Sequence, residues 1–175
     1  MPRRLDDEAN EQREEPPIRS SFVLTVSDGV AGGSRQDESG QALADRLIAF
    51  GYEVSRGVVP DEPAQLAEAV LQAVRAGHRL VVTSGGTGLG PRDRTPEALR
   101  HLLDYEIPGF GEVMRAEGRR STPLADLSRS FGGVIRTTIV LALPGSPAGA
   151  LESLGAVQPL LEHALDTLGG DTRHQ

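Results

Sequence analysis

A glycine-rich stretch, TSGGTGLGPRDRTPEAL, occupies residues 83–99 and carries residue types that could bind a phosphate. Glycine loses more conformational entropy on folding than any other residue, so such a cluster needs a geometric reason. The reason is either a tight turn or backbone that approaches a ligand closely. Successive backbone N–H groups in such a turn can hold an anion, and a helix starting at Thr95 would add its dipole. We expect a phosphate-binding loop formed by Gly85, Gly86, Thr87, Gly88 and Gly90.

This stretch matches neither of two common phosphate-binding motifs. The P-loop requires a lysine and a hydroxyl residue after its last glycine, whereas Pro91 and Arg92 follow Gly90 here. The dinucleotide motif G-x-G-x-x-G fails as well, because Gly86, Gly88 and Gly90 are evenly spaced. The backbone N–H groups of this stretch could still bind an anion, although it contains neither motif.

Two acidic residues, Asp61 and Asp93, lie in loops and could bind Mg²⁺. This ion is hard and bridges carboxylates and nucleotide phosphates. In the alternative interpretation, Asp61 caps the helix that follows it, and Asp93 forms a turn or an ion pair with Arg92. Arg92 in turn could hold a phosphate through two hydrogen bonds or bind a carboxylate at a helix end. The spacing leaves both interpretations open.

Two further loops carry polar or rigid residues. Ser27 and Asp28 follow the first apolar run, FVLTV, and the turn PGSP at 144–147 follows the last run, TIVLAL. Prolines on both sides of Gly145 and Ser146 make this turn rigid, although a simple helix start also explains them. No Ser/His/Asp order supports nucleophilic catalysis.

Short apolar strands alternate with helical segments, and these elements must position the loops. Strands are expected at 22–26, 53–59, 80–82 and 138–143. Helices are expected from Ser39, Asp61 and Thr95, each as an N-cap, and over 148–168, with a further helical stretch after the Pro-Gly break at 108–109. The alternation predicts the α/β class, a three-layer α/β/α domain with a central, mostly parallel sheet.

The carboxyl ends of parallel strands meet at one edge of a sheet, where ligands of such folds bind. The loops after Val26, Val59, Val82 and Leu143 should therefore gather there. These loops carry nearly all the candidate binding and metal-ligating residues named above.

Length and composition narrow the function classes. A chain of 175 residues suits one domain, which we expect at 21–171 after a charged tail at 1–20. The absence of cysteine excludes disulfides and thiolate metal sites. A formal net charge of −7 and an aromatic content of 3% argue against a nucleic-acid partner. No apolar run approaches the ~20 residues of a membrane helix, and no signal-peptide core is present. We expect a cytoplasmic protein without a membrane partner.

The strings TVSD, VVPDE, TSGGTGLGPRDRTPEA, EIPGFGEVMR and LPGSP occur in this order along the chain. Together they closely resemble the MogA/MoaB family of molybdenum cofactor biosynthesis, which includes the G domain of gephyrin. The resemblance covers about residues 20–170.

The resemblance implies a MogA-like fold, a homotrimer, and binding of molybdopterin, a pterin dithiolene phosphate. It implies that molybdopterin is adenylylated with Mg-ATP, which releases pyrophosphate, and that other molybdenum-cofactor enzymes are partners. The important acidic positions of the family match Asp61 and Asp93, which implies catalytic and Mg²⁺-binding roles. The implied substrate-binding residues are Ser27, Asp28, Thr83, Gly85, Gly86, Thr87, Gly88, Gly90, Arg92, Thr95, Pro144, Gly145 and Ser146.

Two positions depart from the family pattern. Ala148 stands where many relatives have a lysine, and Gly29 stands where many have an arginine. Arg35 or Arg92 could replace the lost charge. An alternative function is therefore a carrier that binds molybdopterin or a precursor without chemistry, and a third is a scaffold. Retention of Asp61 and Asp93 favours the enzyme.

Overall fold

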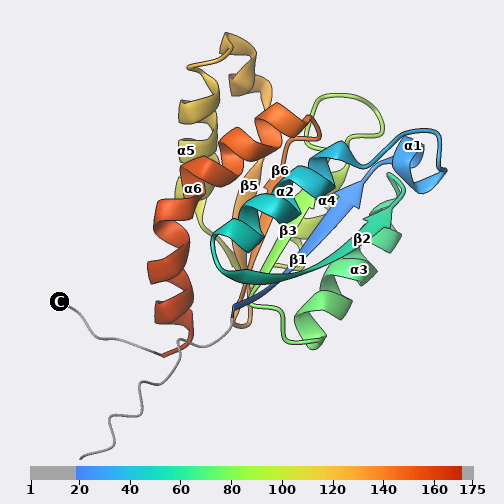
Figure 1. Ribbon diagram of the computed structural model, residues 1–175. Coiled ribbons are helices and arrows are strands. Elements are labelled where there is room, and N and C mark those ends of the chain that lie inside the picture. Colours follow the sequence, from blue (N-terminus) through green and yellow to red (C-terminus); the bar gives the residue numbers. More distant parts are fainter. Residues whose placement is uncertain (1–18, 171–175) are drawn as a thin grey trace, which may run out of the picture.

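A sheet of six strands runs through the described part of the chain, residues 19–170 of a computed structural model (Figure 1). The strands are β1 (Arg19–Val26), β2 (Tyr52–Val59), β3 (Leu80–Ser84), β4 (Tyr105–Glu106), β5 (Phe131–Ile135) and β6 (Thr138–Leu143). Their spatial order is β2-β1-β3-β6-β5-β4. The first four in that order are parallel, whereas β5 pairs antiparallel with both β6 and β4.

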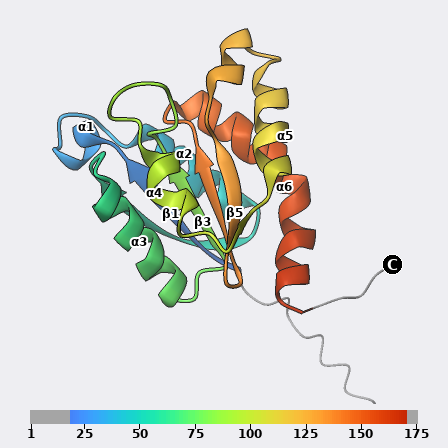
Figure 2. The same cartoon turned by 180° about the vertical axis from the view of Figure 1, so that it is seen from behind.

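Helices cover both faces of this sheet and complete the three layers expected from the sequence (Figures 1 and 2). One apolar core joins the sheet to α2 (Glu38–Ala49), α5 (Pro108–Gly118) and α6 (Pro147–Leu168). The other joins it to α3 (Pro63–Arg75) and α4 (Thr95–Arg100). The remaining helices are short: α1 (Asp28–Ala31) and the 3₁₀ helix η1 (Pro123–Leu127). The α/β fold class is confirmed.

The central strands owe their place to continuous apolar runs. Every residue of β3 and β6 is buried, as expected for parallel strands that are covered on both faces. Because these strands cannot slip without exposing apolar side chains, their ends are fixed in space. The loops that leave their carboxyl ends are therefore held on a rigid edge.

The sequence pattern indicates four strands, and the two additional strands, β4 and β5, correct that prediction. The Gly132-Gly133 pair in β5 resembles a turn in sequence, yet both glycines are strand residues. A Cβ at Gly132 would lie 2.6 Å from Cδ2 of Phe110, and one at Gly133 would lie 2.5 Å from Cδ1 of Leu103. Close packing against these side chains explains the glycines.

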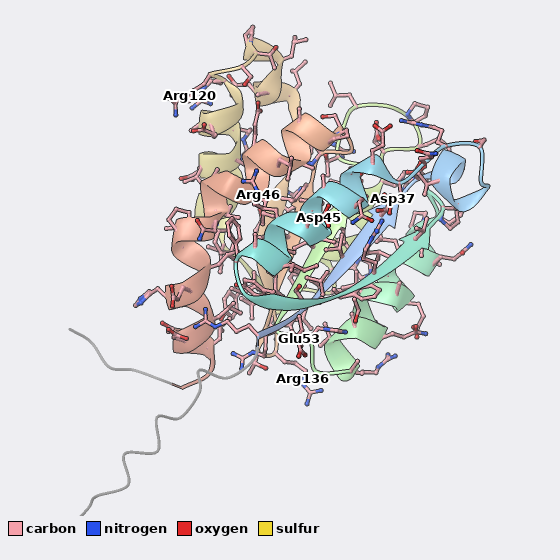
Figure 3. The ribbon with its side chains drawn as sticks, in the orientation of Figure 1. Asp37, Asp45, Arg46, Glu53, Arg120 and Arg136 are labelled. Atoms are coloured by element: carbon pink, nitrogen blue, oxygen red, sulfur yellow. The ribbon has the colours of Figure 1, made fainter. Side chains whose placement is uncertain are left out.

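The start of the domain and one helix cap also differ from expectation. β1 begins at Arg19, so Arg19 and Ser20 belong to the sheet, while the rest of the expected tail, 1–18, lies outside the described residues. α2 is capped by Asp37, whose carboxylate accepts a hydrogen bond from the Gly40 N–H at 2.9 Å (Figure 3). Ser39 lies inside the helix and instead accepts from the Ser84 hydroxyl at 3.1 Å. Among residues 19–170, no helix combines the length and apolar character that a membrane span requires.

Candidate functional site

A cleft of about 680 Å³ opens at the carboxyl edge of the parallel strands. The loops after β1, β2, β3 and β6 all reach it, as the alternation of strands and helices predicts. The expected site residues on its wall are Ser27, Asp61, Gly85, Gly86, Asp93, Gly145 and Ser146.

A second hollow of about 470 Å³ adjoins this cleft and contains more of the glycine loop. Thr87, Gly88 and Pro144 line it together with apolar side chains of η1. Four residues line both spaces: Gly86, Asp93, Gly145 and Ser146. The two spaces therefore meet at one acidic residue and two backbone turns.

Five of the expected residues line neither space: Asp28, Thr83, Gly90, Arg92 and Thr95. The Thr83 side chain is fully buried, and its hydroxyl donates to the Leu141 carbonyl at 3.4 Å. Thr95 is the first residue of α4 rather than its cap, and its buried hydroxyl donates to the Gly85 carbonyl at 2.8 Å. Both threonines hold the framework behind the cleft.

Asp28 and Asp61 connect the loops after β1 and β2 through a reciprocal pair of hydrogen bonds. The Asp28 N–H donates to Oδ2 of Asp61, and the Asp61 N–H donates to Oδ1 of Asp28, each at 2.9 Å. Asp61 is thus not the cap of α3; Glu62 precedes that helix and makes no capping bond. The bridge fixes the Asp61 carboxylate at the cleft wall.

Arg92 is bound to carboxylates at the edge of this bridge. Its Nε and Nη2 each donate to Asp28 at 3.0 Å, and Nη2 also donates to Glu62 at 3.2 Å. The hydrogen bond from the Asp61 backbone, together with Arg92, lowers the pKa of Asp28 despite some desolvation. The pKa of Arg92 is raised, because Asp28 and Glu62 stabilise its charged form. The geometry favours the carboxylate-binding interpretation of Arg92.

Contacts inside the protein account for the glycines at the start of the loop. Gly85 has φ +113° and Gly86 has φ +67°, conformations that side chains disfavour. A Cβ at Gly85 would lie 2.3 Å from the Val26 carbonyl oxygen, and one at Gly86 would lie 2.3 Å from Oγ1 of Thr95. Both glycines are required for the close approach of β1, β3 and α4.

The later glycines make room for Asp93. Its Oδ2 accepts from the Gly90 N–H at 2.8 Å. A Cβ at Gly88 or Gly90 would lie 2.9 or 2.8 Å from that same oxygen. The loop is therefore wrapped around the Asp93 carboxylate, and phosphate binding is not needed to explain its composition.

Backbone donors nevertheless remain available at this place. Within residues 19–170, the N–H groups of Gly86, Thr87, Gly88 and Leu89 donate no hydrogen bond. At the start of α6, the same holds among these residues for the N–H groups of Gly145, Ser146 and Ala148. Unpaired N–H groups near a helix start are the donors that phosphate oxygens accept from.

The acidic groups fit a hard cation such as Mg²⁺. Asp61 and Asp93 each use only Oδ2 in the hydrogen bonds found in residues 19–170, which leaves both Oδ1 atoms without a donor. One or two carboxylates together with substrate phosphates are the usual ligands of protein-bound Mg²⁺. The described chain contains no cluster of three or more acidic or histidine side chains that could hold a metal alone. The donor set therefore suits an ion that arrives with a phosphate.

Arg35 is a cleft residue that the sequence suggested only as one of two substitutes for missing charge. It lines the main cleft and is exposed. Its guanidinium has no hydrogen-bond or ion-pair partner among residues 19–170, unlike that of Arg92. A Cβ at Gly29 would lie 2.8 Å from Cδ of Arg35. The absence of a side chain at Gly29 thus leaves the space in which the Arg35 stem lies.

Several residues that line the two spaces could not be recognised from the sequence, because they lie in an irregular segment or inside secondary structure. The residues concerned are Thr25, Val26, Val30, Gln36, Glu38, Ser39 and Ser84 in the main cleft, and Leu89, Leu124, Leu127 and Ser128 in the second hollow. Pro147 also lines the main cleft, as the last residue of the expected turn at 144–147. The segment between β1 and α2 has no apolar periodicity that would orient its side chains, so its contribution depends on the folded path.

Comparison with known proteins gives consistent matches over most of the chain. A family model described as "Probable molybdopterin binding domain" matches residues 22–163. The molybdenum cofactor biosynthesis bifunctional protein of Synechococcus elongatus is 42% identical over 149 residues, 85% of this chain and 47% of that protein. The molybdopterin adenylyltransferase of Pyrococcus furiosus is 36% identical over 161 residues, 89% of this chain and 95% of that protein.

Solved structures agree with these matches. The crystal structure of the molybdopterin biosynthesis enzyme MoaB from Thermus thermophilus has a TM-score of 0.82 and 50% sequence identity, covering 87% of this chain and 98% of that chain. The chain spans about half the length of the bifunctional relatives, since the matched region covers 47% of one of these proteins and 48% of another.

Proposed function

The chain belongs to the molybdopterin-binding domain family of molybdenum cofactor biosynthesis, and we propose that it transfers the adenylyl group of ATP to molybdopterin. The observation that carries this proposal is the pair of adjoining spaces that share Gly86, Asp93, Gly145 and Ser146. A reaction that joins two phosphate-bearing molecules needs two binding spaces that meet where the phosphates react. Adenylyl transfer to the phosphate of molybdopterin is such a reaction.

In the proposed reaction, an oxygen of the molybdopterin phosphate attacks the α-phosphorus of ATP. A new P–O bond forms, the bond from the α-phosphorus to the bridging oxygen of pyrophosphate breaks, and pyrophosphate leaves with that electron pair. The attacking phosphate oxygen is already ionised near neutral pH, so no protein base has to remove a proton. Catalysis then depends on positioning and charge neutralisation.

The chain offers groups for both tasks. The unpaired N–H groups of the glycine loop and of the α6 start would bind phosphate oxygens through hydrogen bonds. Arg35 would add a positive charge to a cleft wall that also carries Glu38, Asp61 and Asp93. Asp61 and Asp93 are proposed as catalytic residues that orient the reacting phosphates; neither forms a covalent bond to substrate.

Mg²⁺ is part of this proposal, with the free Oδ1 atoms of Asp61 and Asp93 as its protein ligands. When bound, the ion would neutralise charge on the ATP phosphates. The acidic wall supports this role, because three carboxylates beside a polyphosphate would repel it without a cation.

The assembly and place of action belong to the same proposal and rest on the resemblance to MogA and MoaB. We propose a homotrimer that acts in the cytoplasm and passes its product to other molybdenum-cofactor enzymes.

A carrier that binds molybdopterin without chemistry is the second candidate. Ala148 and Gly29 favour it, because each stands where the resemblance to the MogA/MoaB family implies a basic residue. The position of Arg35 over Gly29 weakens this argument, since it brings a positive charge back to the cleft.

The test is to replace each acidic residue by its amide and measure turnover and molybdopterin binding. Asp93→Asn keeps an oxygen that can accept from the Gly90 N–H but removes the charge. We expect Asp61→Asn and Asp93→Asn to lower kcat by about a hundredfold or more while molybdopterin still binds. Asp45→Asn, on the exposed side of α2, is the matched control and should retain wild-type turnover (Figure 3). Unchanged turnover in Asp93→Asn would contradict the assigned role.

A further inference from the structure

The side chain of Arg129 holds the glycine loop from its far side. Its Nε donates to the Gly88 carbonyl at 2.9 Å, and its Nη2 donates to the Asp93 carbonyl. Its own backbone N–H donates to the Thr87 carbonyl at 2.9 Å. One residue thus binds three carbonyl groups of the loop, from a part of the chain that lies just before β5.

These bonds determine where the N–H groups of the loop point. In a trans peptide unit, the C=O and the following N–H point in opposite directions. Because the Thr87 carbonyl points to Arg129, the Gly88 N–H points away from it. Because the Gly88 carbonyl also points to Arg129, the Leu89 N–H points away as well. These two N–H groups have no partner within residues 19–170, and both residues line the second hollow.

A loop with this composition needs such a constraint. Glycines at positions 86, 88 and 90 allow peptide units to rotate at little steric cost. A rotated unit would present a carbonyl oxygen, which repels a phosphate, in place of an N–H. The planar guanidinium suits the task, since its donors have fixed directions and can bind several carbonyls at once.

The remaining nitrogen of the Arg129 guanidinium, Nη1, is bound by Glu97 of α4. Nη1 donates to Oε1 of Glu97, an ion pair in which the Arg129 side chain is 30% exposed. The carboxylate therefore fixes the plane of the guanidinium while Nε and Nη2 bind the loop.

We propose that Arg129 is a positioning residue that presets the glycine loop for phosphate binding by orienting the Gly88 and Leu89 N–H groups. The inference rests on the proposed function in assigning the phosphate of molybdopterin to this loop. Arg129 itself does not touch the substrate.

The test compares Arg129→Lys with Glu97→Gln and with Arg75→Lys. Lysine keeps the positive charge but lacks the fixed, planar set of donors that a guanidinium has. Glu97→Gln weakens only the ion pair that holds the guanidinium in its plane. Arg75→Lys is the matched control, since Arg75 forms an exposed pair with Glu68 on α3. Thermal unfolding of each variant shows that it is folded.

The first readout needs no turnover. Inorganic phosphate is titrated into ¹⁵N-labelled protein, and the amide resonances of Gly88 and Leu89 are followed by NMR. We expect saturable shifts in the wild type and in Arg75→Lys, a phosphate affinity about tenfold weaker in Arg129→Lys, and a smaller loss in Glu97→Gln. An unchanged affinity in Arg129→Lys overturns the inference, and so does the absence of phosphate shifts in the wild type.

The second readout is the KM for molybdopterin. A mispositioned loop raises KM by about tenfold or more, whereas a merely unfolded fraction lowers the apparent kcat and leaves KM unchanged. An unchanged KM in folded Arg129→Lys also overturns the inference. Phosphate binding that depends on Arg129 in a wild type without turnover would support the positioning role and refute the adenylyltransferase proposal.

Discussion

The substitution Gly85→Ala tests why glycine is needed where β3 enters the loop. The backbone at this position has φ +113°, which costs an L-residue about 1–3 kcal/mol. The new Cβ would also lie 2.3 Å from the carbonyl oxygen of Val26, a backbone atom at the end of β1. Because a backbone atom cannot rotate away as a flexible side chain can, the end of β1 or the loop must shift, at a cost of about 1–3 kcal/mol.

The two effects sum to a loss of about 2–6 kcal/mol in the free energy of unfolding, with a midpoint of about 4 kcal/mol. For a chain of this size, that midpoint corresponds to a decrease in Tm of about 8–16 °C. The shift should also reach the cleft, since a Cβ built at Gly145 would already lie 3.3 Å from the Gly85 Cα. Urea denaturation followed by circular dichroism measures the stability change.

Gly155→Ala is the matched control, because it introduces the same methyl group without a clash. A Cβ at Gly155 meets nothing within 4 Å, and the residue lies inside α6. Alanine should stabilise the helix there by up to about 1 kcal/mol. If Gly85→Ala unfolds at the same urea concentration as the wild type, the steric reasoning about this loop is wrong.

Three other outcomes are expected. Leu141→Ala removes a fully buried side chain from the middle strand β6 and should cost about 2–5 kcal/mol in urea denaturation; a cost below that of a surface substitution would contradict the packing described. Asp37→Ala removes the acceptor for the Thr25 hydroxyl and the Gly40 N–H and should cost about 1–3 kcal/mol by the same assay, and an unchanged midpoint would refute this capping role. Burial lowers the pKa of His78 below its ordinary value of 6.5, so the unfolded chain binds a proton first and stability should fall as the pH drops below that value. The difference in Tm between about pH 7.5 and about pH 5.5 should therefore be smaller in His78→Leu than in the wild type, and an equal difference would show that His78 does not contribute.

The central parallel strands could be predicted because they contain short, mostly apolar runs. β3 and β6 bury every residue, and β1 buries five of its eight, including all of the last four, which leaves little ambiguity about their conformation. β5 could not be found in this way. Its two glycines resemble a turn, and only their pairing with β4 and β6 shows that they are strand residues. The hairpin to β6 also lacks a typical turn sequence, since Arg136 has φ +57° where glycine or asparagine is usual.

The location of the cleft could be predicted because parallel strands fix where their loops meet. The roles of individual residues could not, since they depend on contacts distant in sequence. Thr83 follows the apolar run 80–82 and was expected to bind substrate, yet its hydroxyl is buried against Leu141. The sequence is compatible with Asp61 as a helix cap, whereas in the structure its carboxylate accepts a hydrogen bond from the Asp28 N–H. Arg129 lies 36 residues after Asp93, and no sequence pattern connects it with the glycine loop.

The most direct test of the central claim is an anaerobic incubation of the protein with molybdopterin, ATP and Mg²⁺. Adenylyl-molybdopterin is followed by mass spectrometry, and pyrophosphate release is measured in the same sample. The proposed function predicts that both products form in equal amounts and that both form about a hundredfold or more slowly with Asp93→Asn. Tight binding of molybdopterin without consumption of ATP would contradict it and identify the protein as a carrier.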